Sequence, residues 1–199
     1  MSNIIKIPLR NVNAYMFQDL QEKYPDAELN IEIGQHQPDG LLTEQQFWEL
    51  IDLLDWNKED DDDAVTASLV SALALLPVRQ IYDFADILSQ KLYFLDGVEF
   101  ARHIGERSWQ PDAYFSVDGF LYVRCCAVAN GKKAFEQILK NPKLMPKDMD
   151  FEPLLYVASD AFEQKTGMAW DYIPAFNMET YSNKAGWENQ TEQPQASAA

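Results

Sequence analysis

The residues best suited to bind a ligand lie in one stretch, between Ser108 and Arg124. Aromatic and turn residues there precede an apolar helix that carries a single charge, the guanidinium of Arg124. An arginine is not deprotonated at ordinary pH, so a buried one must find a carboxylate, a cluster of carbonyl oxygens or a bound anion. The residues that could form such an anion site are Trp109, Asp112, Tyr114, Asp118 and Arg124.

Each of these side chains also has a purely structural interpretation, which we favour. Buried charges are usually paired within the protein, so an internal ion pair is expected for Arg124. Its candidate partners are Asp112, Asp83, Asp86, Asp160 and Glu99. Asp118 falls in the first turn of the same helix, where a carboxylate favours the helix dipole. Trp109 and Tyr114 could line a pocket mouth or anchor their loop on the core.

The sequence offers no set of catalytic or metal-binding residues. Cys125 and Cys126 are neighbours within an apolar stretch, so we expect buried, reduced thiols with no histidine placed to act as a base. His36 and His103 have no cysteine, aspartate or histidine at metal-ligand spacing. We therefore predict no catalytic residue, no metal site and no cofactor, and we lean against an enzyme.

The charge of the chain restricts its partners. The 199 residues carry 32 acidic and 16 basic side chains, a formal net charge of −16. A field of that sign repels nucleic-acid phosphates, so direct binding to DNA or RNA is disfavoured. It attracts a basic protein, although surplus acid can also serve solubility alone. No secretory signal or membrane-spanning apolar run is evident, which predicts a soluble, cytoplasmic protein with no membrane contact.

The hydrophobic pattern predicts two structural regions. Residues 1–34 read as a small β-α-β unit, with alternating strands on either side of the helix Val12 to Lys23. Two strands alone are marginal, so this unit should lie on the main body or pair with a second copy, giving a monomer or weak dimer. Residues 42–171 read as helix after helix, and we predict a mainly α fold, a multi-helix orthogonal bundle.

Several helix boundaries in this domain carry recognisable signals. Thr43 and Gln46 have the spacing of a capping box, and Leu42 can pack against Phe47 as a hydrophobic staple. Ser116 should cap a helix that is apolar on nearly all sides, the most buried element expected. The expected helices are one starting after Thr43, then 64–76, 77 to about 97, 98–104, 116 to about 130, 132–140, and one capped by Asp150 that ends at Gly167. Residues 172–187 should form an irregular aromatic segment, and residues 188–199 a disordered polar tail.

Several of these stretches resemble a known bacterial family. The resemblance rests on Phe47–Asp52, Ala74–Pro77, Tyr114–Cys125, Val128–Gly131 and Leu154–Ala158, and it covers about residues 42–171. The family is the domain of unknown function 4240. It implies an all-helical domain without an established reaction, so it supplies no catalytic residues.

Two functions remain open from the sequence. The first is a non-enzymatic protein-recognition module, immunity-like or regulatory, whose acidic helical surface binds a basic protein. The second is a sensor of a small anionic ligand, or a cryptic enzyme, with a pocket around Trp109, Asp112, Tyr114 and Arg124.

Overall fold

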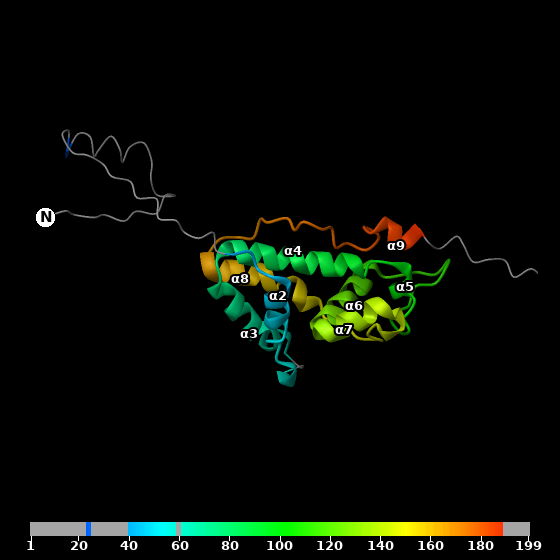
Figure 1. Cartoon of the computed structure of the whole chain (residues 1–199). Coiled ribbons are helices and arrows are strands. Elements are labelled where there is room, and N and C mark those ends of the chain that lie inside the picture. Colours follow the sequence, from blue (N-terminus) through cyan, green and yellow to red (C-terminus); the bar gives the residue numbers. More distant parts are fainter. Residues whose placement is uncertain (1–22, 25–39, 59–60, 189–199) are drawn as a thin grey trace, which may run out of the picture. The chain divides into compact units, whose positions relative to one another are not determined.

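The computed structural model describes residues 23–24, 40–58 and 61–188, which Figure 1 draws in colour. The chain divides into two compact units, Met1–His36 and Gln37–Ala199. Only Lys23 and Tyr24 of the first unit are described, so the predicted β-α-β unit lies outside the described residues. The second unit contains everything that follows.

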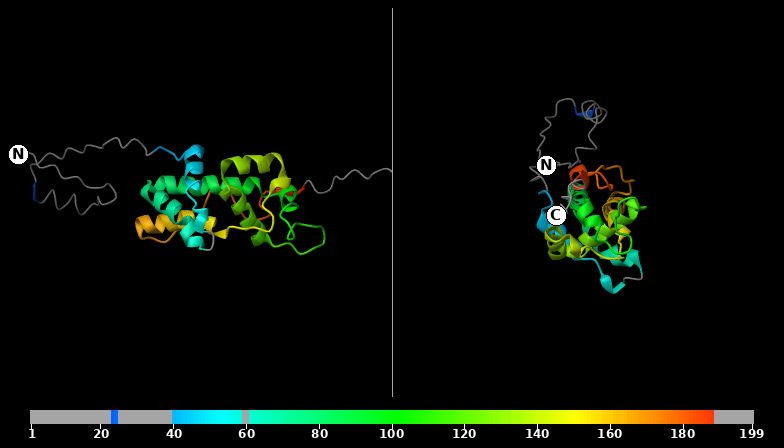
Figure 2. Two further views of the ribbon diagram at one scale, coloured as in Figure 1. Left: turned by 90° about the horizontal axis from the view of Figure 1, so that it is seen from below. Right: turned by 90° about the vertical axis from the view of Figure 1, so that its right-hand side faces the viewer.

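The described part of the chain is helical and contains no strand, which confirms the mainly α prediction. In chain order the helices are α2 (Glu44–Ile51), α3 (Asp62–Leu75), α4 (Val78–Phe94), α5 (Val98–Ala101), α6 (Val117–Ala129), α7 (Gly131–Lys140), α8 (Val157–Thr166) and α9 (Lys184–Glu188). Single 3-10 turns lie at η2 (Trp56–Lys58), η3 (Pro142–Leu144) and η4 (Glu152–Leu155). Helix α2 crosses the long axis of α4 steeply in Figure 1 and in the left view of Figure 2.

Local signals set the beginnings of the first helices. The capping box at α2 is present: the Thr43 hydroxyl accepts a hydrogen bond from the amide of Gln46, whose side chain accepts one from the amide of Thr43. Leu42 and Phe47 are both buried, as the staple prediction requires. Helix α3 begins at Asp62, two residues earlier than predicted, because Asp61 is the residue that caps it.

The core forms around α4 and α6. Helix α4 contributes Ile81, Phe84, Leu88 and Leu92, which recur at helical spacing and are all buried. Residues 123–129 of α6 are all buried, so the prediction of a central helix is confirmed. Ser116 caps it as expected, its hydroxyl accepting from the Gly119 amide at 3.1 Å.

Some predicted helix boundaries are wrong. Asp150 does not cap a helix; its carboxylate binds both terminal nitrogens of Arg107 at 3.0 Å. The buried Phe151 donates its amide to the Tyr122 carbonyl, so the chain first makes the 3-10 turn η4 and α8 begins only at Val157. Helix α5 stops at Ala101, three residues short of the predicted end. Gly167 ends α8 in the left-handed conformation, as predicted.

Residues 170–188, which we call the strap, pack on the helical unit. They were expected to be irregular, and they are so up to Asn183, but α9 follows and includes Glu188, which had been placed in the polar tail. Figure 1 shows the strap in orange and red, running along α4 from the end of α8 to α9. The remainder of the predicted tail, residues 189–199, lies outside the described residues.

Candidate binding sites

The guanidinium of Arg124 is fully buried and held by neutral oxygen atoms. Nη1 donates to the Leu92 carbonyl and Nη2 to the Thr180 hydroxyl, each at 2.9 Å. The Phe120 ring lies 4.9 Å away, and Nε has no partner among the described residues. Burial lowers the pKa of Arg124, while the charges of Asp96 and Glu179 oppose that change. The side chain is closed off from solvent, not open to a ligand.

The expected ion pair between Arg124 and one of five carboxylates is therefore wrong; a carbonyl and a hydroxyl take that place. Asp83 instead binds Arg79 at 2.9 Å and the Leu42 amide at 3.0 Å. Asp86 accepts bonds from the strap. The three remaining candidates, Asp112, Glu99 and Asp160, have exposed side chains.

The important buried carboxylate is Asp96, which the sequence did not single out. It has no exposed surface, and it accepts hydrogen bonds from the amides of Tyr181 and Asn183, the Ser182 hydroxyl and the Trp187 indole. In the sequence, Asp96-Gly97 resembles an ordinary turn at a helix end. Its partners lie 85 to 91 residues later, so no local pattern could have revealed its role.

The other predicted site residues do not converge on Arg124. Trp109 is half-buried; its amide donates to the Ala101 carbonyl, and Arg102 lies 5.2 Å from its ring, which fits the anchor interpretation. Tyr114 is 95% exposed. Asp112, with a left-handed φ of 60°, and Asp118 in the first turn of α6 are also exposed. None of the five predicted residues lines either of the two cavities described below.

The two cysteines are free and buried, as predicted. Burial raises the pKa of the Cys125 thiol and raises that of Cys126 to about 11. Both thiols are therefore protonated at neutral pH, which is unfavourable for a nucleophile.

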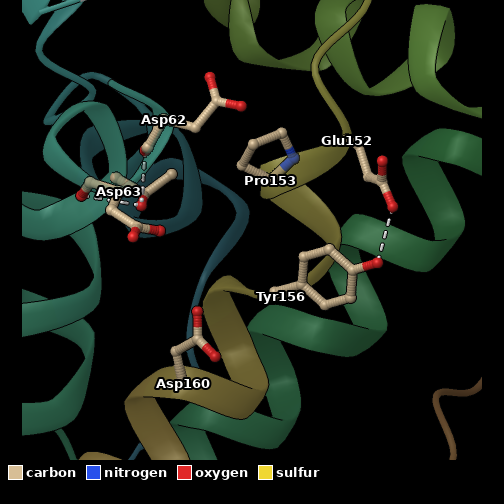
Figure 3. Close-up of a pocket in the computed structure, with 7 residues that line it drawn as sticks. Asp62, Asp63, Glu152, Pro153, Tyr156 and Asp160 are labelled. Atoms are coloured by element: carbon tan, nitrogen blue, oxygen red, sulfur yellow. Dashed lines mark hydrogen bonds between the residues drawn. The ribbon is translucent and has the colours of Figure 1, made fainter.

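The larger cavity is an open cleft of about 330 Å³ on a different part of the unit. In Figure 3, Asp62 and Asp63 of α3 lie on one side of this space, and Glu152 of η4, Tyr156 between η4 and α8, and Asp160 of α8 lie on the other. We call it the acidic cleft, and its lining residues are Asp62, Asp63, Thr66, Glu152, Pro153, Tyr156 and Asp160.

No described lysine or arginine forms an ion pair with the four carboxylates of the acidic cleft. Glu152 accepts a hydrogen bond from the Tyr156 hydroxyl at 2.7 Å, which raises the pKa of Tyr156. Burial, followed by the nearby charges of Glu163 and Asp63, raises the pKa of Asp160. The cleft therefore presents uncompensated negative charge beside the apolar surfaces of Pro153 and Tyr156.

The sequence did contain a partial signal for this cleft. Each of its carboxylates lies in the first turn of a helix or 3-10 turn, where helix-dipole stabilisation is a sufficient local explanation. What the sequence could not show is that three such turns meet. The packing of α3 against both α8 and η4 brings them together.

A comparison with protein families matches residues 42–164, more than half of the chain, to the family described as a protein of unknown function, DUF4240. The chain belongs to the DUF4240 family. The match covers α2 to most of α8 and ends before the strap. No curated protein and no solved structure matches the chain significantly. The DUF4240 assignment thus confirms the predicted family and leaves the activity to be argued from the site.

Two further properties of the DUF4240 chain apply to its described residues. Within them, no helix has both the length and the apolar character needed to cross a bilayer. No group of three or more histidine, cysteine or acidic side chains in that part of the chain is arranged to hold a metal ion.

Proposed function

We propose that this protein is a non-enzymatic recognition module that binds a basic protein partner through the acidic cleft. The observation that carries the proposal is the meeting of four carboxylates from α3, η4 and α8 around one open space, with no described cation paired to them. An arginine or lysine of a partner would supply the missing positive charge. An immunity-like or a regulatory role would use the same contact.

The surroundings of the acidic cleft suit a protein partner. Tyr156 is 50% exposed at the cleft and offers a ring face to a guanidinium or an apolar side chain. Trp56, 43% exposed, lies with its ring 5.0 Å from Phe151, the residue before Glu152. Aromatic residues are enriched in protein interfaces, and the rims of such interfaces are polar. The net charge of −16 would in addition speed the approach of a basic partner.

The alternative, an anionic-ligand sensor around Arg124, has weaker support. The guanidinium has no exposed surface, and two of its nitrogens are already bonded. Trp109 is connected to Arg124 only through other rings. Its ring contacts Trp187, which contacts Phe120, and the Phe120 ring lies against the Arg124 guanidinium. A ligand would have to displace the strap before it could reach Arg124.

The test compares two triple variants of equal charge. Asp62→Asn, Asp63→Asn and Asp160→Asn together neutralise the cleft, while the control combines Glu99→Gln, Glu136→Gln and Asp171→Asn at exposed positions outside it. Binding is measured by fluorescence anisotropy with a labelled peptide of alternating arginine and serine. Exposed charge pairs contribute about 0.5 kcal/mol each, so the cleft variant should bind about tenfold more weakly at low salt.

The control variant should retain most of the affinity. Equal losses in both variants would show that the peptide senses only net charge, and the proposed site would then be rejected. A peptide of alternating glutamate and serine should not bind any of the proteins.

A further inference from the structure

The strap is held in the manner of a bound peptide. Between residues 171 and 180, even-numbered positions are partly buried against the helices and odd-numbered positions are exposed without exception. This period of two is that of an extended chain with one face on a surface. The inward residues are Tyr172, Pro174, Phe176, Met178 and Thr180.

Helix α4 and Asp96, two residues beyond its end, supply the hydrogen-bond acceptors for four backbone amides of the strap. Asp86 accepts from the Ala175 amide at 2.7 Å, and Ser89 accepts from the Phe176 amide at 3.4 Å. Further along, Asp96 accepts from the amides of Tyr181 and Asn183 at 3.1 and 2.9 Å. These four amides of the strap are therefore bonded to side chains of α4 and Asp96 and not to the backbone of a strand.

Aromatic contacts set the register of the strap on α4. The Tyr172 ring stacks on Tyr82 at 4.2 Å with an interplanar angle of 9°, and its hydroxyl donates to Asp86 at 2.9 Å. Phe176 lies 5.5 Å from Tyr93. Backbone bonds combined with pockets for alternate side chains are how extended peptides are recognised on proteins.

The strap is less deeply buried than the helices on which it packs. None of residues 170–188 is fully buried, whereas α4 and α6 beneath them are buried along their inner faces. A small cavity of about 80 Å³ lies where Trp170, Pro174 and Met178 meet α4 and α8. Packing across this joint is incomplete, and the strap lies beyond the family-matched residues 42–164.

We propose that the surface of α4 under the strap is a peptide-docking groove, and that the strap is its displaceable intramolecular occupant. We call this surface the α4 groove; Tyr82, Asp86, Ser89, Tyr93 and Asp96 define it. The intermolecular occupant is an extended segment of another protein with apolar side chains at alternate positions and lysine or arginine at the outward position that Asp171 takes in the strap.

Charge complementarity is the argument for a basic segment. The groove accepts hydrogen bonds mainly with the carboxylates of Asp86 and Asp96, on a chain of net charge −16. The strap itself places Asp171 and Glu179 at outward positions. Glu179 lies near the charge of Arg124, so Asp171 is the position at which the strap adds like charge to this surface. A positively charged side chain at that position would be attracted to the acidic surface, whereas the carboxylate of the strap is repelled by it. The α4 groove is distinct from the acidic cleft, and each can be tested without the other.

The first experiment uses the full chain and a labelled synthetic peptide. The peptide has the sequence of residues 170–188 with lysine in place of Asp171. The opened protein carries Tyr172→Ser and Phe176→Ser, which weaken its own strap, and circular dichroism checks that it folds. A tethered strap competes at roughly millimolar effective concentration, so the opened protein should bind the peptide at least about tenfold more tightly than the wild type.

Three controls identify the site. Adding Asp86→Ala to the opened protein should abolish the gain in peptide affinity over the wild type. A peptide of the same composition in scrambled order should bind the opened and wild-type proteins equally. Neutralising the acidic cleft with its three asparagine substitutions should leave the gain in place, which separates this proposal from the function proposed above. Equal binding of the peptide to the opened and wild-type proteins, or insensitivity to Asp86→Ala, overturns the proposal.

Hydrogen exchange on the wild-type chain gives an answer even if the opened variant does not fold. The amides of Ala175, Phe176, Tyr181 and Asn183 should exchange through a local opening whose rate hardly depends on low denaturant. The amides of α6 should exchange through global unfolding. If the strap amides also exchange only by global unfolding, the strap is a fixed part of the core and the groove is not available to a partner.

Discussion

Asp160 is a carboxylate in an unfavourable place. Its side chain is exposed overall but loses part of its hydration in the cleft, and this loss together with the neighbouring charges of Glu163 and Asp63 raises its pKa. No described cation compensates it. A raised carboxylate pKa means that the folded state binds the proton more tightly than the unfolded state. The ionised side chain therefore opposes folding, and this opposition grows as pH rises through the window above the ordinary value of 3.8.

We expect Asp160→Asn to raise the melting temperature at pH 7, because the asparagine carries no charge to repel Asp63. The gain should shrink as pH falls and disappear below the ordinary carboxyl pKa of 3.8. Thermal unfolding followed by circular dichroism at several pH values measures it. A gain that is the same at acid and neutral pH would mean that charge is not the cause. Retention of a destabilising side chain is typical of functional sites.

Arg124 is the residue whose surroundings differ most from expectation. It satisfies two nitrogens with neutral oxygens and leaves Nε without a described partner, so its burial is poorly compensated. A buried charge of this kind can often be replaced by an apolar side chain of similar volume with little loss.

Arg124→Met should therefore change the free energy of unfolding by no more than about 1.5 kcal/mol. Arg124→Ala should lower it by about 3 kcal/mol, since truncation adds a cavity. Urea denaturation of both variants provides the measurement. If methionine is as damaging as alanine, then the bonds to Leu92 and Thr180 stabilise the fold more than the side chain's volume does.

At the scale of elements, the attachment of α9 depends on a close backbone contact. Gly97 is the N-cap of α5, and Gly186 lies in α9. A Cβ atom added at Gly186 would lie 2.6 Å from the Asp96 carbonyl oxygen. That oxygen belongs to the backbone and cannot move aside as a flexible side chain could. Only glycine allows α9 to approach the end of α4 this closely.

Gly186→Ala should lower the free energy of unfolding by about 1 to 3 kcal/mol through this steric conflict. Because the adjacent Trp187 indole donates to Asp96 at 2.8 Å, displacement of α9 should also shift tryptophan emission to longer wavelength. Gly40→Ala is the control, since a Cβ there meets nothing within 4 Å. An alanine at position 186 that leaves both stability and emission unchanged would show that α9 is not fixed by this contact.

At the scale of the whole molecule, the net charge of −16 opposes compaction. Described ion pairs are few, and the acidic cleft concentrates repulsion at one point. Salt screens such repulsion over a Debye length of about 10 Å at 0.1 M and about 3 Å at 1 M. Stability should therefore depend on ionic strength.

Raising sodium chloride from about 0.01 M to about 0.5 M should raise the melting temperature, because screening weakens self-repulsion. In the triple variant Asp62→Asn, Asp63→Asn and Asp160→Asn, salt should raise the melting temperature less than in the wild type. Differential scanning calorimetry compares them. An equal gain in both proteins would assign the repulsion to the surface at large and not to the cleft.

Most helices of this protein can be predicted from the sequence, because the signals that start and end them are local. The capping box of Thr43 and Gln46, the Ser116 cap and the end of α8 at Gly167 all depend on residues within a few positions of one another. The burial of α6 was likewise predictable, because its sequence is apolar on nearly all sides. The local prediction was wrong at Asp150, because its carboxylate accepts a long-range hydrogen bond from Arg107 and does not cap a helix.

Which charged groups come together depends on packing between segments that are distant in the sequence. Tyr172 and Asp86 are separated by 86 residues, and Arg124 and Thr180 by 56, so no spacing within one element encodes these pairs. The acidic cleft likewise exists because α3, η4 and α8 pack together, although each carboxylate alone looks like a helix-dipole partner. The alternation from Tyr172 to Thr180 is visible in the sequence, but the surface that it matches is formed only by folding.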